Sequence, residues 1–477
     1  MRRPTLLAAY AALITPALLG AQLSTVTPAM AFPPPRFSRP FGTLQQQAEV
    51  QQRWLATRMR TVLPALMRKH GVDMWIVPMR EYNEDPVFSS LVSPTTFAAR
   101  RRTIYVFFDR CASTGKVDAG DGACVERIAL GGTSQGGVYE AKRSMKVAPG
   151  GNAGTGRSAE LWGAEQWGAL KEVVEARSPK VIAINWSTTF AFTDGLSHGE
   201  YVGMTDALGA AWTARMKPAE ALALELIATR LPEEQQFYAR LQALVWSLTE
   251  EMFSARTIVP GKTRTSDLVW WWRQRVNDLG LGTWFQPSIE VQRRGATEEQ
   301  LGDDPIIQRG DVLHCDVGIT ALDLNTDTQH MAYVLLPGEK APPAGMLAAL
   351  KNANRMQDFA MEEIRPGVTG NEALKAVLTR MRAAGIDGTM YSHPIGKHGH
   401  GAGPLVGLWD YQEGVPGRGD ATVIANMWYS IELQATTPVK EWGGQPVRMA
   451  QEEDMVIGPD GKAVWAIRRQ DRLWLVK

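Results

Sequence analysis

Hydrophobic and polar positions follow two different patterns along the chain. Over about residues 40–205, the apolar runs VDMWIVPM, TIYVFFD, RIALGG and KVIAINW have the length of buried strands. The segments QQQAEVQQRWLATRMRTVLPALMRKHG and ELWGAEQWGALKEVVEA instead carry apolar residues at helical spacing. Strands mixed with helices in this way predict an α/β domain.

From about residue 210 the pattern becomes mainly helical. PAEALALELIATRLPEEQQFYARLQALVWSLTEEMF is predicted to be long and helical, and PGKTRTSDLVWWWRQRVNDLG is predicted to be a second helix after a Pro-Gly turn. Three strand-like runs follow, then MLAALKNANRMQDFAMEEIRPG and NEALKAVLTRMRAAG as another helix pair, then more strands. Two halves of this kind predict an internally duplicated domain.

The first 31 residues have the pattern of a secretory signal. Two arginines precede an apolar run, and Ala29-Met30-Ala31 fits a cleavage site. We therefore predict a signal peptide (1–31), an α/β domain (32–210) and a second domain (211–477), with the mature protein exported to the periplasm or secreted. An uncleaved anchor is the alternative, but the run is short and Pro16 interrupts it; no later segment is apolar enough to span a bilayer.

Overall composition points away from nucleic acid. The chain has 51 basic and 50 acidic residues, a formal net charge of +1 and no long block of one sign. A small-molecule or peptide substrate fits better. The glycine-rich stretch at 148–158 lacks the Gly-Lys-Ser/Thr ending of a phosphate-binding loop, so we interpret it as a flexible loop.

The three cysteines allow at most one intramolecular disulfide. Cys111 and Cys124 flank a polar, glycine-containing stretch between two predicted strands, so they could form a disulfide in an exported protein or remain two separate thiols. Cys315 lies within an apolar strand and is interpreted as a small buried hydrophobic residue.

Acidic residues occur at unusual places in the predicted strands of the second domain. Asp316 lies in LHCDVGI and Asp327 in LNTDTQHMAYVL. In WYSIELQAT, period-two alternation places Glu432 on the polar face, and VRMAQEEDMVIGPDG supplies Glu452 or Glu453 at a strand entrance. Buried acids are rare unless they are paired or bind metal.

Three of the seven histidines fall within SHPIGKHGHGAG, residues 392–403. Together with the acids, the order along the chain is Asp, Asp, His, Glu, Glu. A two-metal hydrolase needs such a set, because carboxylates can bridge two divalent cations about 3.5–4 Å apart and water between them becomes acidic.

This order and spacing resemble the pita-bread metallopeptidases, the group of aminopeptidase P, prolidase and methionine aminopeptidase. The resemblance covers roughly residues 215–477, and the preceding domain is similar to the creatinase-type N-terminal domain of the aminopeptidase P and prolidase branch. It implies an α/β N-terminal domain followed by an α+β pita-bread catalytic domain with internal pseudo-two-fold duplication. It also implies a homodimer that hydrolyses peptides with proline at the second position, as an Xaa-Pro aminopeptidase or dipeptidase.

The resemblance also implies individual roles. The ligands of two divalent metal ions, Mn²⁺ or else Zn²⁺ or Co²⁺, would be Asp316, Asp327, His393, Glu432 and Glu452. Glu432 would also carry the proton from water to the leaving nitrogen, and His400 would bind substrate and stabilise the oxyanion. His398 is an additional histidine that would either line the substrate site or remain solvated.

Two assignments have rivals. His393 fits the family pattern of a ligand followed by Gly396 and a second histidine seven residues on, whereas Gly399-His400-Gly401 also resembles the motif and would make His400 the ligand, with Gly407 at the second position. For the last ligand, Glu452 is favoured because Gly461 lies nine residues later, and Glu453 is the fallback.

The sequence departs from the family pattern at three places. The family has a histidine about seventeen residues before the first Asp, but GATEEQLGDD contains none. His330 stands where an Arg is usual, and the stretch after His400, residues 401–420, suggests an added loop. Three alternative hypotheses remain: an inactive scaffold that acts as a binding protein, metal-free hydrolysis of the creatinase type, or hydrolysis of a substrate other than Xaa-Pro peptides. The complete ligand set argues against the first two.

Overall fold

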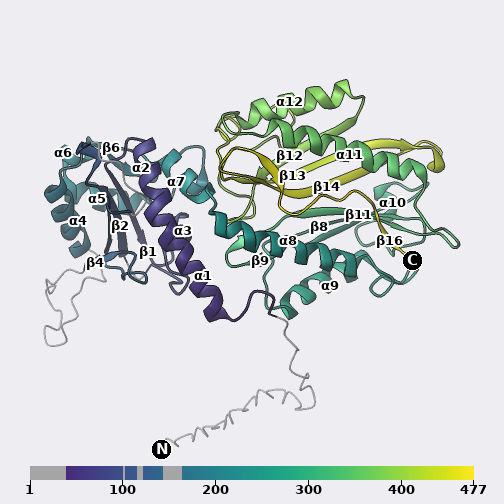
Figure 1. The fold of residues 1–477 in the computed structure, drawn as a ribbon, viewed down its shortest axis with the longest axis horizontal. Coiled ribbons are helices and arrows are strands. Elements are labelled where there is room, and N and C mark those ends of the chain that lie inside the picture. Colours follow the sequence, from purple (N-terminus) through teal and green to yellow (C-terminus); the bar gives the residue numbers. More distant parts are fainter. Residues whose placement is uncertain (1–38, 100–101, 115–121, 143–163) are drawn as a thin grey trace, which may run out of the picture. The chain divides into compact units, whose positions relative to one another are not determined.

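The computed structural model describes residues 39–99, 102–114, 122–142 and 164–477 (Figure 1). Residues Ser38–Lys477 form one compact unit. Within the described residues no helix has the length and apolar character needed to cross a membrane. The predicted signal peptide and the glycine-rich stretch at 148–158 lie outside the described residues.

A mixed six-stranded sheet forms the first half of this unit, in the order β4-β3-β2-β1-β5-β6. Its strands are β1 (Met74–Arg80), β2 (Arg102–Asp109), β3 (Val125–Leu130), β4 (Glu140–Lys142), β5 (Ile182–Ile184) and β6 (Met216–Pro218). β1 pairs antiparallel with β2 and parallel with β5. The four strands predicted from apolar runs are β1, β2, β3 and β5, so the α/β prediction is confirmed.

Helices cover both faces of this sheet. Successive residues of β1 point to opposite faces, so Trp75 and Val77 join one apolar core while Met74 and Ile76 join the other. Figure 1 shows α4 and α5 on one side of the sheet and α1, α2 and α7 on the other. The helical elements are α1 (Leu44–Thr57), the π-helical turn η2 (Arg58–Val62), α2 (Leu63–Lys69), α3 (Phe88–Leu91), η3 (Ala112–Thr114), α4 (Ala164–Arg177), η6 (Ala191–Thr193), α5 (His198–Leu208), α6 (Ala210–Thr213) and α7 (Glu220–Ala228).

The elements of the first sheet continue beyond the predicted boundary at residue 210. β6 joins that sheet, and Leu222, Leu226 and Ile227 of α7 pack in its core. The segment predicted as long and helical is divided into α7 and α8 (Pro232–Met252), because Pro232 lacks the N–H that a continuous helix requires and begins a new helix instead. These contacts favour a later boundary, close to the break between α7 and α8.

The second half is built on an eight-stranded sheet whose main path runs β12-β13-β14-β11-β8-β7. These strands are β7 (Ser288–Gln292), β8 (Val312–Val317), β11 (Thr328–Val334), β12 (Asp387–Pro394), β13 (Trp428–Val439) and β14 (Gln445–Ile457), with β15 (Ala463–Trp465) on β14 and β16 (Trp474–Val476) on β11. The remaining elements are α9 (Thr265–Asp278), α10 (Glu298–Leu301), the hairpin of β9 (Thr320–Ala321) and β10 (Leu324–Asn325), α11 (Ala344–Glu363), α12 (Gly370–Ala383) and η7 (Lys440–Trp442).

The sheet divides into two similar halves. β7, β8 and β11 share an apolar core with α8 and α9, and β12, β13 and β14 share another with α11 and α12. Figure 1 shows each helix pair beside its own half of the sheet. The halves meet where β11 pairs antiparallel with β14, with Gln329 opposite Glu452. This arrangement has the internal duplication that the sequence predicted.

Cys111 and Cys124 form a disulfide, which links the end of β2 to the start of β3. Cys315 of β8 is a free thiol buried in an apolar core. The disulfide resolves the alternative left open by the cysteine spacing. A disulfide limits the freedom of the unfolded chain, and this one joins residues separated by 13 positions.

Replacing both cysteines, Cys111→Ser with Cys124→Ser, is expected to lower the free energy of unfolding by about 2–3 kcal/mol. Urea unfolding of the wild type with and without reductant measures the same loss. The double variant is the control, since reductant should no longer change its stability. Equal stability of the oxidised and reduced wild type would contradict the disulfide.

Candidate metal centre

Acidic and histidine side chains from both halves of the second sheet converge on one face of it. Side chains alternate along a strand, and the strand register places Asp316, Glu432 and Glu452 on one face, whereas the neighbouring Cys315 and Ile431 pack in the apolar cores. In the register of β13 and β14, Glu432 lies directly opposite Glu452. The predicted ligands brought together on this face are Asp316, Asp327, His393, Glu432 and Glu452.

Overlapping groups of ligand atoms connect these residues. In each of the groups Asp316–Asp327–Glu452 and His393–Glu432–Glu452, one donor atom per residue lies within 4.8 Å of the others. His393 Nε2 is 3.6 Å from Asp327 Oδ2 and 3.5 Å from Glu452 Oε1. Glu452 is a member of both groups, and His393 also lies close to Asp327. The five side chains therefore form one continuous site.

Exposure differs across the site. Asp327, His393 and Glu452 are buried, whereas Asp316 and Glu432 are only partly buried. Asp327 directly precedes β11. The sequence had suggested that Glu452 stands at a strand entrance, but it lies well inside β14. The partly exposed carboxylates therefore mark the side from which a substrate can approach.

The charge of this cluster is poorly compensated by the protein itself. Removal from water raises the pKa values of Asp316, Asp327 and Glu432, and the neighbouring Glu452 carboxylate raises each of them further. Asp316 Oδ1 is buried, and no hydrogen bond to it is found among the described residues. Buried carboxylates that face one another in this way are the donor set that divalent cations stabilise.

His393 presents its lone pair to the same acids. Its Nδ1 lies 3.0 Å from the Pro394 carbonyl oxygen, which only accepts, so the neutral ring carries its proton on Nδ1 and directs the Nε2 lone pair at Asp327 and Glu452. Nε2 is buried without a hydrogen-bond partner in the described part of the chain. Burial opposes protonation of the ring, but the nearby Glu452 carboxylate outweighs it and raises the pKa of His393. A lone pair aimed at two carboxylates fits a ligand to a shared cation.

His400 occupies a different position from His393. It is exposed in the loop after β12, with its ring centroid 4.7 Å from that of His393 and 5.2 Å from that of Trp284. Gly407, the second position in the rival assignment, has φ +78°, and a Cβ there would lie 2.6 Å from the Met390 carbonyl oxygen. A histidine would not fit at that position. His400 lies within 4.8 Å of ligand atoms of Asp327 and His393, but only His393 is also grouped with Glu432 and Glu452, so the geometry favours His393 as ligand and His400 as its neighbour.

His398 is not brought to the carboxylates. Its ring packs 4.8 Å from Phe192, and burial followed by the Lys397 charge lowers the pKa of His398 to about 4. Its predicted contribution to substrate binding stays a prediction. The fallback ligand Glu453 also lies away from the cluster, on the opposite face of β14.

Glu453 and His330 form a buried pair on that opposite face. Trp474 donates its indole N–H to His330 Nδ1, so His330 Nε2 carries the proton that bonds Glu453 Oε1 at 2.8 Å. Trp246 donates to the other oxygen of Glu453 at 3.2 Å. His330, which stands where the family usually has an Arg, therefore packs on the face of the sheet opposite the predicted ligands and bonds Glu453 and Trp474 there.

Polar residues that sequence analysis missed support the ligands. Gln329 Nε2 donates to Glu432 Oε1 at 2.9 Å and to Glu452 Oε2 at 3.0 Å, while Gln329 Oε1 faces His314 Nε2 at 2.9 Å. Ser430 donates to Glu452 Oε1 at 2.6 Å. Period-two spacing could have identified both, because Gln329 follows Asp327 by two residues and Ser430 precedes Glu432 by two.

A further buried acid fixes the start of β11. Asp454 Oδ2 accepts a hydrogen bond from the Tyr238 hydroxyl at 2.6 Å, another from Gln242 Nε2, and one from the Asp327 backbone N–H at 3.4 Å. Two side chains of α8 thus bond the same carboxylate that bonds the backbone of Asp327, a predicted ligand.

Residues 242–458 match the model of metallopeptidase family M24. A dipeptidase from Pyrococcus horikoshii OT3 is similar, with a TM-score of 0.54 and 16% identity over 88% of this chain and 100% of its own. An X-Pro aminopeptidase from Thermotoga maritima MSB8 gives a TM-score of 0.55 and 15% identity over 86% and 100%.

A protein that is not named as a peptidase also has a similar fold. The N-terminal domain of FACT complex subunit SPT16 from Cicer arietinum gives a TM-score of 0.53 and 12% identity over 89% of this chain and 99% of its own. At such identities the likeness shows the fold alone. No curated protein sequence matches the chain.

The matched segment contains all five predicted ligands as well as His400. It also contains β8, β11, β12, β13 and β14, the strands on or beside which those ligands lie. This segment is thus identified as a metallopeptidase family M24 domain, and the chain has the pita-bread fold preceded by an N-terminal α/β domain.

Proposed function

We propose that this metallopeptidase holds two divalent cations and removes residues from peptides that have proline at the second position. The observation that carries the proposal is the cluster of four carboxylates and one imidazole with His400 beside it. Further support comes from the shared fold with proteins named as a dipeptidase and an X-Pro aminopeptidase.

In this proposal Asp316, Asp327, His393, Glu432 and Glu452 would together hold the two cations. Bound divalent metals supply Lewis acidity for a peptide carbonyl and lower the pKa of water at the site. An oxygen-rich set with one imidazole suits Mn²⁺ and also admits Zn²⁺ or Co²⁺.

The chain's own groups would move the protons. Glu432 is partly exposed on the open side, so its carboxylate can accept a proton from the attacking water and return it to the leaving nitrogen. His400 stands across from His393 and can donate a hydrogen bond to the oxygen on which negative charge develops. Gln329 would keep Glu432 and Glu452 at a fixed separation by bonding both.

Two further proposals concern the mature protein. The N-terminal pattern supports export to the periplasm or secretion, and a disulfide between Cys111 and Cys124 suits an oxidising compartment. The resemblance to the aminopeptidase P and prolidase branch supports a homodimer.

A different substrate is the second candidate. The sequence has no histidine in the stretch where the family has one before the first Asp, and residues 401–420 depart from the family pattern in a way that suggests an added loop next to His400. Both features would change which peptide fits while leaving the ligands in place. A catalytically inactive scaffold is disfavoured by the complete ligand set.

A peptide panel tests the proposed activity. We expect Ala-Pro or Ala-Pro-Ala, and not Ala-Ala-Ala, to be cleaved by the mature protein, with cleavage lost after chelation and restored by Mn²⁺, Zn²⁺ or Co²⁺. The ratio of dipeptide to tripeptide cleavage separates dipeptidase from aminopeptidase. Bound metal near two ions per chain without cleavage of either proline peptide would remove the Xaa-Pro assignment.

Replacing a proposed ligand, Asp327→Asn, is expected to lower metal-restored turnover about a thousandfold, because a bound divalent cation would supply several kcal/mol of transition-state stabilisation. Elemental analysis should show metal lost from the variant while its circular dichroism is retained. Asp358→Asn is the matched control and should keep full activity. Asp358 lies on α11 and forms a surface ion pair with Arg469. Full activity in the Asp327 variant would refute the assignment.

Replacing the supporting amide, Gln329→Met, is expected to weaken metal affinity or activity by roughly 10–100-fold, because it removes both hydrogen bonds to the ligands. Metal titration and steady-state kinetics measure the two effects. Gln434→Met is the matched control, since Gln434 is the next residue on the same face of β13 and its amide bonds Thr389 and Arg448 instead of a predicted ligand. Equal losses in both variants would mean that Gln329 has no special role.

A further inference from the structure

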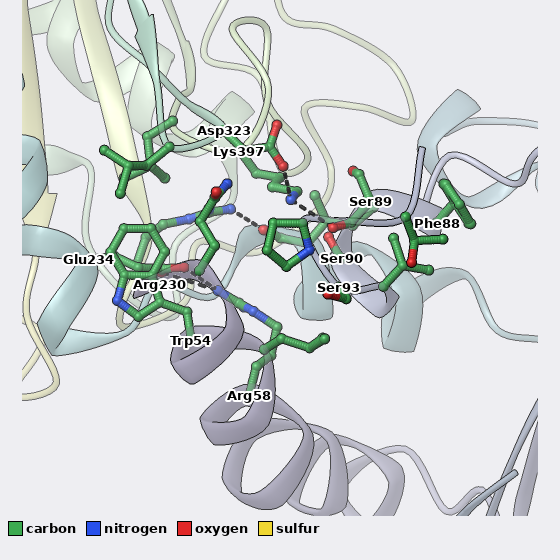
Figure 2. Close-up of a pocket in the computed structure, with 18 of the residues that line it drawn as sticks. Trp54, Arg58, Phe88, Ser89, Ser90, Ser93, Arg230, Glu234, Asp323 and Lys397 are labelled. Atoms are coloured by element: carbon green, nitrogen blue, oxygen red, sulfur yellow. Dashed lines mark hydrogen bonds and ion pairs between the residues drawn. The ribbon is translucent and has the colours of Figure 1, made fainter. Parts of the chain in front are cut away.

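A separate cavity lies away from the carboxylate cluster, where the first sheet's helices meet the second sheet's loops. Its volume is about 370 Å³, and its walls come from α1 and η2, the stretch around α3, the break between α7 and α8, the β9–β10 hairpin and Lys397. Figure 2 shows charged side chains from several of these elements directed toward one another. None of the predicted metal ligands lines this cavity.

Three cations and two carboxylates line the cavity. Arg58 Nη2 bonds the Glu234 carboxylate at 2.8 and 3.1 Å, and Lys397 pairs with Asp323 and donates to the Ser89 carbonyl oxygen at 2.8 Å (Figure 2). Arg230 is the remaining charged group. The cluster therefore carries one positive charge more than its carboxylates balance.

Arg230 lies in the break between α7 and α8 and is only 5% exposed. Its Nε donates to the Ala228 carbonyl oxygen at 3.1 Å and its Nη2 to the Ile227 carbonyl oxygen. Its Nη1 is buried, and no partner for it is found within the described residues. No described carboxylate lies within ion-pair distance of Arg230, and burial lowers the pKa of Arg230 only to about 10, so the group stays charged at neutral pH.

A buried charge without a counter-charge is costly, so an anion in the cavity would be stabilising. The N–H groups of a guanidinium match the oxygens of a carboxylate or a phosphate. Ser89 and Ser90 line the same space and bring hydroxyl groups that can donate to an oxyanion. We propose that this cavity binds one small oxyanion, a phosphate or a carboxylate, through Arg230 Nη1.

The cavity adjoins segments that lead to the metal centre. Lys397 lies between His393 and His400, and Asp323 lies in the connection between Asp316 and Asp327. Asn325 joins these two segments: its backbone N–H donates to the Gly396 carbonyl oxygen at 2.7 Å, and its Nδ2 donates to the Gly396 and Lys397 carbonyl oxygens at 3.0 and 3.1 Å. An anion held at Arg230 would thus stabilise the loop that carries His400, whether or not the peptidase proposal is correct.

Calorimetric titration of the mature protein with inorganic phosphate, and separately with acetate, at constant ionic strength tests the proposal. Binding of either anion near one per chain is expected, and the preferred anion identifies the class. The Asp327→Asn variant should bind the anion as the wild type does, which separates this cavity from any anion held at the metal centre. Failure of both anions to bind would overturn the proposal.

Two variants locate the site by effects of opposite sign. Arg230→Gln should weaken binding more than about tenfold, because it removes a charged hydrogen-bond donor. Asp323→Asn removes a competing carboxylate and should strengthen binding on the order of threefold, and its half-exposed position gives a variant that folds if Arg230→Gln does not. Arg240→Gln, on the exposed side of α8, is the matched control and should change nothing. Unchanged affinity in both Arg230→Gln and Asp323→Asn would overturn the assignment.

Discussion

The candidate metal centre depends on four carboxylates being held face to face inside a sheet. Asp316, Asp327, Glu432 and Glu452 repel one another at short range, and partial removal from water strengthens that repulsion. Hydrogen bonds from Gln329 and Ser430 fix individual oxygens but neutralise no charge. Divalent cations are therefore the natural complement of the site, and the strands around it form the rigid frame that keeps the donors in place.

That frame uses the two faces of the sheet for different purposes. On β13, Tyr429, Ile431 and Leu433 pack in the apolar core, while Ser430 and Glu432 point to the polar face. The seam between the duplicated halves, where Gln329 lies opposite Glu452, joins the two sets of ligands. Because side chains alternate strictly along a strand, a shift of one residue in register would exchange the core for the site.

The loop that follows His393 depends on the rest of the molecule. His398 packs on Phe192, Lys397 bonds the backbone at Ser89, and Asn325 bonds the backbone at Gly396. The N-terminal domain thus supports the position of His400 without contributing a predicted ligand. This gives a physical reason for the presence of the α/β domain beside the centre, and the cationic cavity lies within the same set of contacts.

Much of this protein is determined by local sequence. Period-two and helical spacing predicted the main strands and helices and placed Glu432 on a polar face, because side-chain direction follows directly from backbone periodicity. The order of the acids and His393, combined with the family resemblance, indicated the ligand set. The break at Pro232 could also be read locally, since proline cannot continue a helix.

Tertiary structure decided what local patterns could not distinguish. The adjacent acids Glu452 and Glu453 are chemically equivalent in sequence, and only the register of β14 against β13 and β11 directs Glu452 to the centre and Glu453 to His330. The disulfide, the bonds of Gln329 and the cavity around Arg230 likewise join residues distant in the chain. Such contacts depend on long-range pairing and charge balance, which no short window of sequence contains.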